Sequence, residues 1–341
     1  MNVSPLFKSA VFTSALVAAF AGCALAQDAN KSGGVQITKL ADRLRVEING
    51  KLFTEYVYEN TPRPYCYPLN GPGGLPMMRN WPMKDVPGEE HDHPHHRSMW
   101  FTHGEVNGID FWTEAKDFGK IVQTKFDEIT SGRNVGVIRT RNNWVAANGT
   151  PVCSDERTIR IYNRPDNERV VDFEITIQAS HGNVAFGDTK EGTMARRLNE
   201  TMRLKPNKEN SGKPTGHIVN SEGVLDGDTW GKRAKWVDYY GPVDGKIVGV
   251  AMFDHPSNPR HPTWWHVRDY GLFAANPFGQ HDFENLKDNK TIGSMAVAAG
   301  QSVTFKYRLY FHEGDEKTAK VAERYAEFAG GKAKPATPAA K

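Results

Sequence analysis

Four of the 12 histidines of the chain are concentrated in the segment 91–97, whose sequence is HDHPHHR. Imidazole is the side chain best suited to proton transfer near neutral pH, and it is the commonest metal ligand in proteins. Ordinary packing does not require so many imidazoles in one place. The segment therefore predicts a site of chemistry.

Two kinds of chemistry fit this histidine cluster. In an extended chain His91, His93 and His95 point to one side, so they could hold one divalent transition metal such as zinc, copper or iron. Without a metal, His93 with His95 or His96 could act as general acid and base. A solvated histidine-rich loop is the third interpretation, and the sequence leaves all three open.

Charged residues elsewhere could complete such a site. Arg97 directly follows the cluster and could hold an anionic oxygen through two hydrogen bonds; its alternative is an ion pair with Asp92 or Asp110. Lys190 and Glu191 lie between two glycines, which allow the backbone to approach a ligand closely. We expect Glu191 to be a second proton-transfer group and Lys190 an anion anchor, with a polar hairpin turn as the alternative.

A third group of residues is typical of a sugar-binding wall. It consists of His261, Trp264, Trp265 and His266, with Arg268 and Asp269 after them. Aromatic rings cover the apolar face of a sugar, and polar groups fix its hydroxyls. Because neighbouring residues of a strand face opposite sides, we expect only one of the two tryptophans to belong to the core.

The elements that position these residues are predicted to be strands. Apolar and polar residues alternate over 44–48, 171–177 and 303–311, and Asn49-Gly50 predicts a hairpin turn. We expect an all-β fold, a large antiparallel β-sandwich that resembles the supersandwich of galactose mutarotase. One C-terminal helix should follow Asp315, continue to Phe328 and end at Gly330. Two irregular loops, 61–90 and 254–283, are expected to meet over one cleft.

The N-terminal residues predict export. A positive Lys8, an apolar stretch over 9–22 and the pattern Ala24-Leu25-Ala26 indicate a signal peptide over 1–26. A lipoprotein anchored through Cys23 is the less favoured alternative. We expect a single β-sandwich domain over 27–329, a disordered tail over 330–341, and a periplasmic or secreted protein without a membrane span.

Charge and motifs exclude several function classes. The formal charge is +3 and the basic residues are scattered, which argues against a nucleic-acid partner. Phosphate-binding glycine loops, a Gly-x-Ser-x-Gly elbow and a His-Glu-x-x-His motif are absent from the sequence. Cys66 and Cys153 could form a disulfide in an oxidising compartment or remain two separate buried thiols.

Several of these segments occur together in one known family. They are DHPHHR at 92–97 with Trp100, NGIDFW at 107–112, DTKEG at 188–192 and DHPSNPRHP at 254–262 with the following tryptophans. The set resembles the exported bacterial proteins labelled "methane oxygenase PmoA", otherwise a domain of unknown function, over nearly the whole mature chain. The resemblance implies a soluble β-sandwich, and the frequent association of its members with exported sugar-processing enzymes implies a role on carbohydrates.

We therefore expect an exported carbohydrate-active enzyme that uses histidine acid–base chemistry, of lyase, hydrolase or epimerase type, on a small sugar, a glycoside or an oligosaccharide. His93, His95, His96 and Glu191 would be catalytic. One alternative is a metal-dependent oxidoreductase, as the family label suggests, with one transition metal on the three alternating histidines of the cluster. A non-catalytic glycan-binding module is the other.

Overall fold

The computed structural model describes residues 1–2, 33–207 and 216–330. From Gly33 onward the described residues belong to one compact unit. The predicted signal peptide, apart from its first two residues, and the predicted tail beyond Gly330 lie outside the described residues. In the described part no helix is long and apolar enough to span a membrane.

Eight antiparallel strands form the first sheet, in the order β1-β2-β3-β4-β5-β11-β16-β15. Their bounds are β1 (Val35–Lys39), β2 (Arg43–Ile48), β3 (Lys51–Val57), β4 (Tyr65–Leu69), β5 (Met99–His103), β11 (Gly192–Arg197), β16 (Leu272–Asn276) and β15 (Trp264–Val267). Most of these strands are short, and long connections enter and leave the sheet between them. This is the sheet that carries the candidate site.

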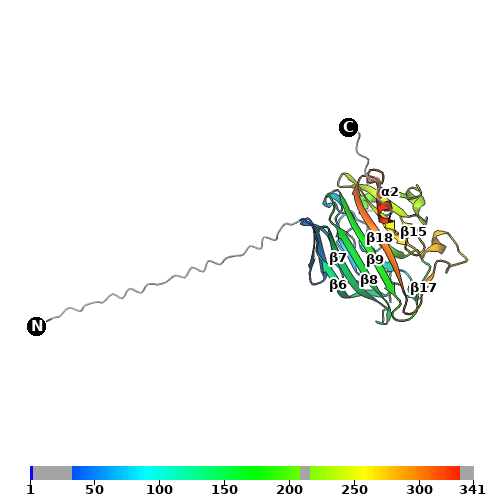
Figure 1. The fold of residues 1–341 in the computed structure, drawn as a ribbon, viewed down its shortest axis with the longest axis horizontal. Coiled ribbons are helices and arrows are strands. Elements are labelled where there is room, and N and C mark those ends of the chain that lie inside the picture. Colours follow the sequence, from blue (N-terminus) through cyan, green and yellow to red (C-terminus); the bar gives the residue numbers. More distant parts are fainter. Residues whose placement is uncertain (3–32, 208–215, 331–341) are drawn as a thin grey trace, which may run out of the picture. The chain divides into compact units, whose positions relative to one another are not determined.

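The second sheet also has eight antiparallel strands, in the order β12-β13-β14-β18-β9-β8-β7-β6. Their bounds are β12 (His217–Asn220), β13 (Trp236–Val243), β14 (Lys246–Asp254), β18 (Ser302–Glu313), β9 (Glu168–Gln178), β8 (Pro151–Tyr162), β7 (Val135–Val145) and β6 (Lys120–Thr130). The long strands β7, β8, β9 and β18 lie side by side in Figure 1. A separate pair joins β10 (Val184–Phe186) to β17 (Met295–Val297).

The two sheets bury one apolar core between their inner faces. Phe101 of the first sheet stacks on Phe173 of the second with ring centroids 6.1 Å apart, and Phe53 meets Phe311 edge to face at 6.2 Å. Each fully buried ring of this size stabilises the fold by roughly 1.5–3 kcal/mol. The alternating pattern that predicted these strands follows from this one-sided burial, and the predicted antiparallel β-sandwich is confirmed.

The predicted first hairpin is also present. Asn49 and Gly50 both have positive φ, 51° and 75°, and connect β2 to β3 with Ile48 opposite Lys51. Two left-handed residues are what a tight two-residue turn requires, because they match the twist of the flanking strands.

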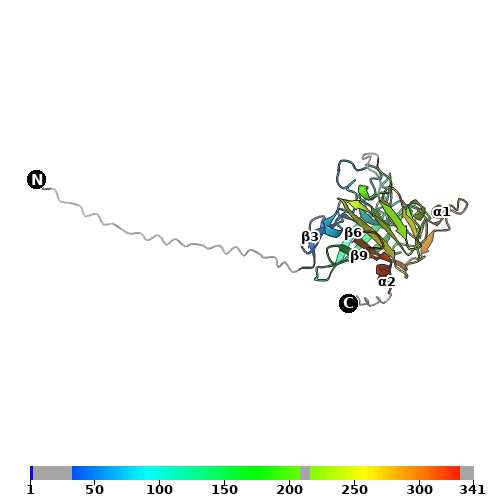
Figure 2. The same ribbon diagram turned by 90° about the horizontal axis from the view of Figure 1, so that it is seen from above.

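The predicted C-terminal helix exists but begins later than expected. It is α2 (Val321–Phe328), and its buried Val321 and Tyr325 pack with Phe253 on the outer face of the second sheet, where Figure 2 shows α2 near β9. Asp315 does not cap this helix, because its carboxylate accepts the Thr318 N–H at 2.8 Å within a preceding turn. Residues 316–320 complete that turn before the helix starts.

The two predicted irregular loops are in fact partly regular, which corrects the sequence interpretation. The first contains β4 and the short 3-10 helix η1 (Pro72–Gly74), and the second contains β15, β16 and the one-turn α1 (Gln280–Phe283). Every residue of β15 and β16 is buried. Strands buried on both faces lack the alternation of polar and apolar residues that identifies a half-exposed strand. Two further 3-10 turns are η2 (Glu200–Met202) and η3 (Asp226–Thr229).

Cys66 and Cys153 are free and buried. Burial raises the pKa of the Cys66 thiol to about 12 and also raises the pKa of the Cys153 thiol. Of the two alternatives left open by the sequence, the structure has two separate buried thiols.

One charged side chain lies in the core without a countercharge. Arg196 is fully buried between the sheets, with one Nη 2.7 Å from the sulfur of Met252 and its guanidinium 4.5 Å from the ring of Phe273. Its Nε and other Nη have no hydrogen-bond partner among the described residues. Burial lowers the pKa of Arg196 to about 9.

Replacing Arg196 with Met is expected to raise the free energy of unfolding by about 1–3 kcal/mol, because an unpaired buried charge is exchanged for an apolar side chain of similar length. Urea denaturation measures the change. Arg157 is the matched control, since it is equally buried but paired with Asp155 at 2.9 Å. Arg157→Met should destabilise the fold by about 3–5 kcal/mol because it leaves the buried carboxylate of Asp155 without its positive partner. A less stable Arg196→Met protein would contradict the prediction.

Candidate active site

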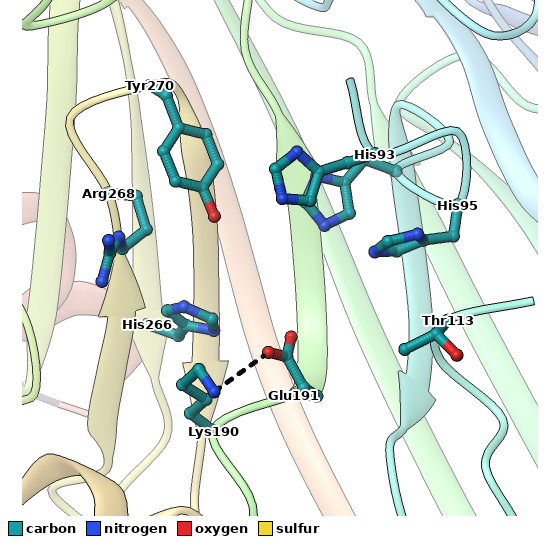
Figure 3. Close-up of a pocket in the computed structure, with 9 residues that line it drawn as sticks. His93, His95, Thr113, Lys190, Glu191, His266, Arg268 and Tyr270 are labelled. Atoms are coloured by element: carbon teal, nitrogen blue, oxygen red, sulfur yellow. Dashed lines mark ion pairs between the residues drawn. The ribbon is translucent and has the colours of Figure 1, made fainter. Parts of the chain in front are cut away.

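The candidate active site is a pocket of about 290 Å³ over the outer face of the first sheet. On β11, Met194 faces the core between the sheets, whereas Ala195 belongs to a separate apolar group with Trp100 and Trp112. This second group forms the floor beneath the pocket. The walls come from the histidine cluster, the chain after β5, the connection into β11, and the β15–β16 hairpin. The lining residues are His93, His95, His96, Thr113, Lys190, Glu191, His266, Arg268 and Tyr270 (Figure 3).

His93 is the best-oriented imidazole of the pocket. Its Nδ1 lies 2.7 Å from the Oδ2 of Asp92, and its ring is held between the rings of His96 and Tyr270, with centroids 4.7 Å and 5.3 Å away and nearly parallel planes. A carboxylate can only accept here, so we assign the proton to Nδ1. With its proton on Nδ1, the ring can present the lone pair of Nε2 to the pocket, and 40% of the side chain remains exposed to receive a ligand.

Asp92 is itself fixed by two arginines that are inaccessible to solvent. Arg197 donates to Oδ1 at 2.9 Å, and Arg79 donates to the same oxygen while also binding the backbone carbonyls of Asp92 and His93. Burial alone would raise the pKa of Asp92. The hydrogen bond with His93 and the charges of Arg197 and Arg79 outweigh burial and hold this pKa well below its usual range. Asp92 is therefore a permanent carboxylate.

The two other cluster histidines that line the pocket are kept neutral. His96 is fully buried, and its Nδ1 lies 3.3 Å from an Nη of Arg197, which can only donate. Burial, then His95 and Arg197, place the pKa of His96 well below its usual value. Burial, then His93 and Arg63, lower the pKa of His95 to about 4. These rings act as hydrogen-bonding walls at neutral pH.

Glu191 and Lys190 enter the pocket from another segment, the connection into β11. Their side chains lie 3.4 Å apart, as drawn in Figure 3. Burial raises the pKa of Glu191, although Lys190 acts in the opposite direction. The backbone here is held close to Gly104, whose N–H donates to the Glu191 carbonyl at 2.6 Å, and a Cβ at Gly104 would lie 2.9 Å from the Cβ of Glu191.

The third wall comes from the β15–β16 hairpin. His266 and Arg268 are two residues apart and share the outer face, while Trp265 and Val267 face the core. Burial, then Arg268, lower the pKa of His266 to about 3, so this imidazole is neutral. The hydroxyl of Tyr270 points into the space between the walls in Figure 3, and burial raises its pKa to about 12.

Residues 43–326 match the family of unknown function DUF6807. The chain belongs to this family. No curated protein matches the sequence. The pocket just described lies within the part of the chain that defines the DUF6807 family.

Solved structures similar to this DUF6807 chain have very different sequences. A protein described as a kojibiose phosphorylase from the human microbiome has a TM-score of 0.35 at 8% identity, covering 82% of this chain and 32% of that one. A polysaccharide lyase has a TM-score of 0.30 at 8% identity, with 84% and 33% covered. A homologue of the GalM/aldose epimerases from C. elegans has a TM-score of 0.30 at 7% identity, with 82% and 100% covered. The chain thus spans about a third of the phosphorylase and the lyase.

The structure brings together most, but not all, of the residues that the sequence singled out. Six of them line the pocket of this DUF6807 protein: His93, His95, His96, Lys190, Glu191 and His266. Arg268, which follows the predicted sugar-binding wall in the sequence, lines the same pocket, whereas the sequence interpretation missed Thr113 and Tyr270. Glycine after Tyr270, between two apolar runs, was the available signal for a hairpin that would carry Tyr270 inward.

Arg97 lies outside the pocket. Its Nε and Nη2 bind the two carboxylate oxygens of Glu114 at 3.0 Å and 2.8 Å, and Glu114 also pairs with the buried Arg63. The predicted partners Asp92 and Asp110 are therefore replaced by Glu114. With one edge of its guanidinium occupied, Arg97 is a structural residue in this geometry.

The predicted sugar-binding wall is not assembled, apart from His266. As expected, only one of the two tryptophans packs in the core between the sheets, which is Trp265. Trp264 is also buried, but beneath Arg233 at 4.5 Å from ring to guanidinium, so neither ring lines the pocket. His261 is bound to Asp254 at 2.7 Å and approaches Tyr325. The two tryptophans of β15 are therefore packed against protein on opposite faces of the strand, and the contact with Asp254 holds His261 outside the pocket.

The ligand set expected for a metal is not assembled either. His91 stacks on Trp81 with ring centroids 4.1 Å apart and pairs with Asp85, so it does not converge with His93 and His95. In residues 33–207 and 216–330 no three His, Cys, Asp or Glu side chains are grouped so that they could hold a metal ion. The geometry of the described residues thus does not fit the three-histidine site.

Replacing Asp92 with Asn is expected to destabilise the protein by about 2–4 kcal/mol, because the buried Arg79 and Arg197 lose their shared negative charge. Urea denaturation provides the measurement. Asp42→Asn is the control, since it removes a carboxylate from an exposed pair with Arg43 and should leave stability nearly unchanged. Equal effects of the two substitutions would show that the buried arginines do not depend on Asp92.

Proposed function

We propose that this protein is an enzyme that transfers protons to and from a carbohydrate bound in the pocket, with His93 as the base and Glu191 as the acid. One observation carries the proposal. Two proton-transfer groups from different segments line one pocket, and their surroundings favour opposite roles. Paired groups with divergent environments are the usual arrangement for acid–base catalysis.

The base role of His93 follows from its contact with Asp92. The carboxylate accepts the Nδ1 proton, fixes the ring and stabilises the imidazolium that forms when Nε2 takes a proton. The two stacked rings prevent rotation of the imidazole. His93 can thus accept a proton without prior rearrangement.

The acid role of Glu191 follows from its burial. A carboxyl group whose pKa is raised retains its proton at higher pH and can donate it to a leaving or carbonyl oxygen. Lys190, 3.4 Å away, can then stabilise the carboxylate that remains. Proton uptake and proton donation are in this way assigned to different walls.

The dimensions and lining of the pocket support a carbohydrate as substrate. A volume of about 290 Å³ is at the small end for ligand sites and suits roughly one sugar ring. The walls offer neutral imidazoles and the phenol of Tyr270 to the hydroxyls of a sugar. The aromatic ring of Tyr270 adds an apolar surface.

The pocket favours elimination or epimerisation over hydrolysis. Glu191 is the only carboxylate among the nine lining residues, whereas most glycoside hydrolases need two carboxylates across the scissile bond. Elimination and epimerisation need a base that removes a proton from carbon and an acid that donates one, which His93 and Glu191 supply.

The proposal is tested by incubating the protein in D₂O with a panel of aldoses, uronic acids and their methyl glycosides, and following loss of C–H signals and appearance of products by proton NMR. Wild-type protein should catalyse exchange or conversion, and His93→Ala should lower the rate by about 10²–10⁴-fold. Trp264→Phe is the control, because Trp264 lies outside the pocket. Binding without exchange or product, unchanged in His93→Ala, would identify a glycan-binding module instead.

Glu191→Gln is expected to remove the alkaline limb of the pH profile of kcat/KM. The ordinary pKa of a glutamate side chain is about 4.3, and burial raises the pKa of Glu191 above it. The proton-donating form is therefore lost only as pH rises through this higher pKa.

The raised pKa also predicts that Glu191→Gln is more stable than wild type at neutral pH, because an ionised carboxylate is poorly solvated at this position. Thermal unfolding measures the second effect, and an unchanged pH profile would remove Glu191 from the mechanism.

A further inference from the structure

Arg268 lines the pocket without an ion-pair partner among the described residues. The other guanidiniums around the site each have a carboxylate partner: Arg79 and Arg197 share Asp92, and Arg63 and Arg97 share Glu114. A guanidinium at the edge of a pocket is costly to leave without a negative partner once a ligand excludes water. The difference between Arg268 and its neighbours therefore points to a partner supplied by the ligand.

Two aromatic rings hold Arg268 in place. Its guanidinium carbon lies 5.7 Å from the ring centroid of Trp230 and 5.6 Å from that of Tyr270. Such contacts orient the planar group and leave its N–H groups available for hydrogen bonds. No other hydrogen bond of this side chain competes for them within the described residues.

The electrostatic environment of this wall is positive. Burial, then the charge of Arg268 and also that of Lys190, lower the pKa of His266. The side chain of Lys190 pairs with Glu191, and the Lys190 backbone N–H binds the carboxylate of Asp282. The neutral imidazole of His266 does not compensate the charge of Arg268, so a ligand that carries a negative group gains attraction as well as hydrogen bonds.

We infer that Arg268 anchors a carboxylate of the substrate, so that the pocket takes acidic sugars such as hexuronates. The planar fork of a guanidinium matches a carboxylate with two parallel hydrogen bonds. This inference rests on the proposed carbohydrate substrate, but not on the assignment of acid and base. It gives Arg268 a specific role and names a substrate class that the sequence motifs did not indicate.

The test is isothermal titration of the His93→Ala protein, which cannot turn over the ligand if the proposed function holds. The ligands are glucuronate, galacturonate and mannuronate, each beside its neutral parent sugar, at low and high salt. At least one acid should bind roughly 10- to 100-fold more tightly than its parent, and added salt should weaken this preference. Arg268→Gln in the same background should abolish the preference, while Arg268→Lys should retain part of it.

Arg233→Gln is the matched control, because Arg233 lies over Trp264 as Arg268 lies over Trp230, but outside the pocket. It should leave the preference unchanged, and circular dichroism should show that every variant folds. Failure of all three acids to bind, or a preference that survives Arg268→Gln, would overturn the inference. Catalysis on neutral sugars alone would also overturn it while leaving the proposed function intact. If acidic sugars bind in a way that depends on Arg268 but wild-type protein does not convert them, the role of Arg268 is supported and the proposed enzymatic function is wrong.

Discussion

The site depends on a single carboxylate shared by two buried guanidiniums. Asp92 holds Arg79 and Arg197 on one side and the imidazole of His93 on the other. Without this negative charge, two cations beneath the pocket would repel each other in a region that excludes water. The same contact sets which nitrogen of His93 carries its proton, so the packing requirement and the chemical requirement fall on one residue.

The first sheet carries the pocket and the second supports it, and this difference follows from the lengths of their strands. Five strands of the second sheet, β6, β7, β8, β9 and β18, have 11 or 12 residues and few long interruptions between them. The first sheet has strands of four to seven residues. Short strands end early and release the connections that form the walls of the pocket. The second sheet supplies the stable support on which those connections can be held.

The sequence predicted the architecture because its pattern is local. Alternation around Val171 and Phe173 reports a half-buried strand, and the residue types of His93 and Glu191 indicate chemistry wherever they lie. The contacts that complete the site are not local: Arg197 is 105 residues from Asp92 and Arg79 is 13 away. Closeness in sequence also gave a wrong prediction: His261 and His266 were expected in one binding wall, but His261 binds Asp254 and only His266 lines the pocket. The family label, export and the tail stay predictions.

The two buried thiols have a consequence for the stability of the fold. A disulfide exchanges through a thiolate, and burial suppresses the thiolate of both Cys66 and Cys153. No covalent bond between the strands β4 and β8 has to form for the sandwich to close. The stability of the sandwich over the described residues therefore does not depend on the redox state of Cys66 and Cys153.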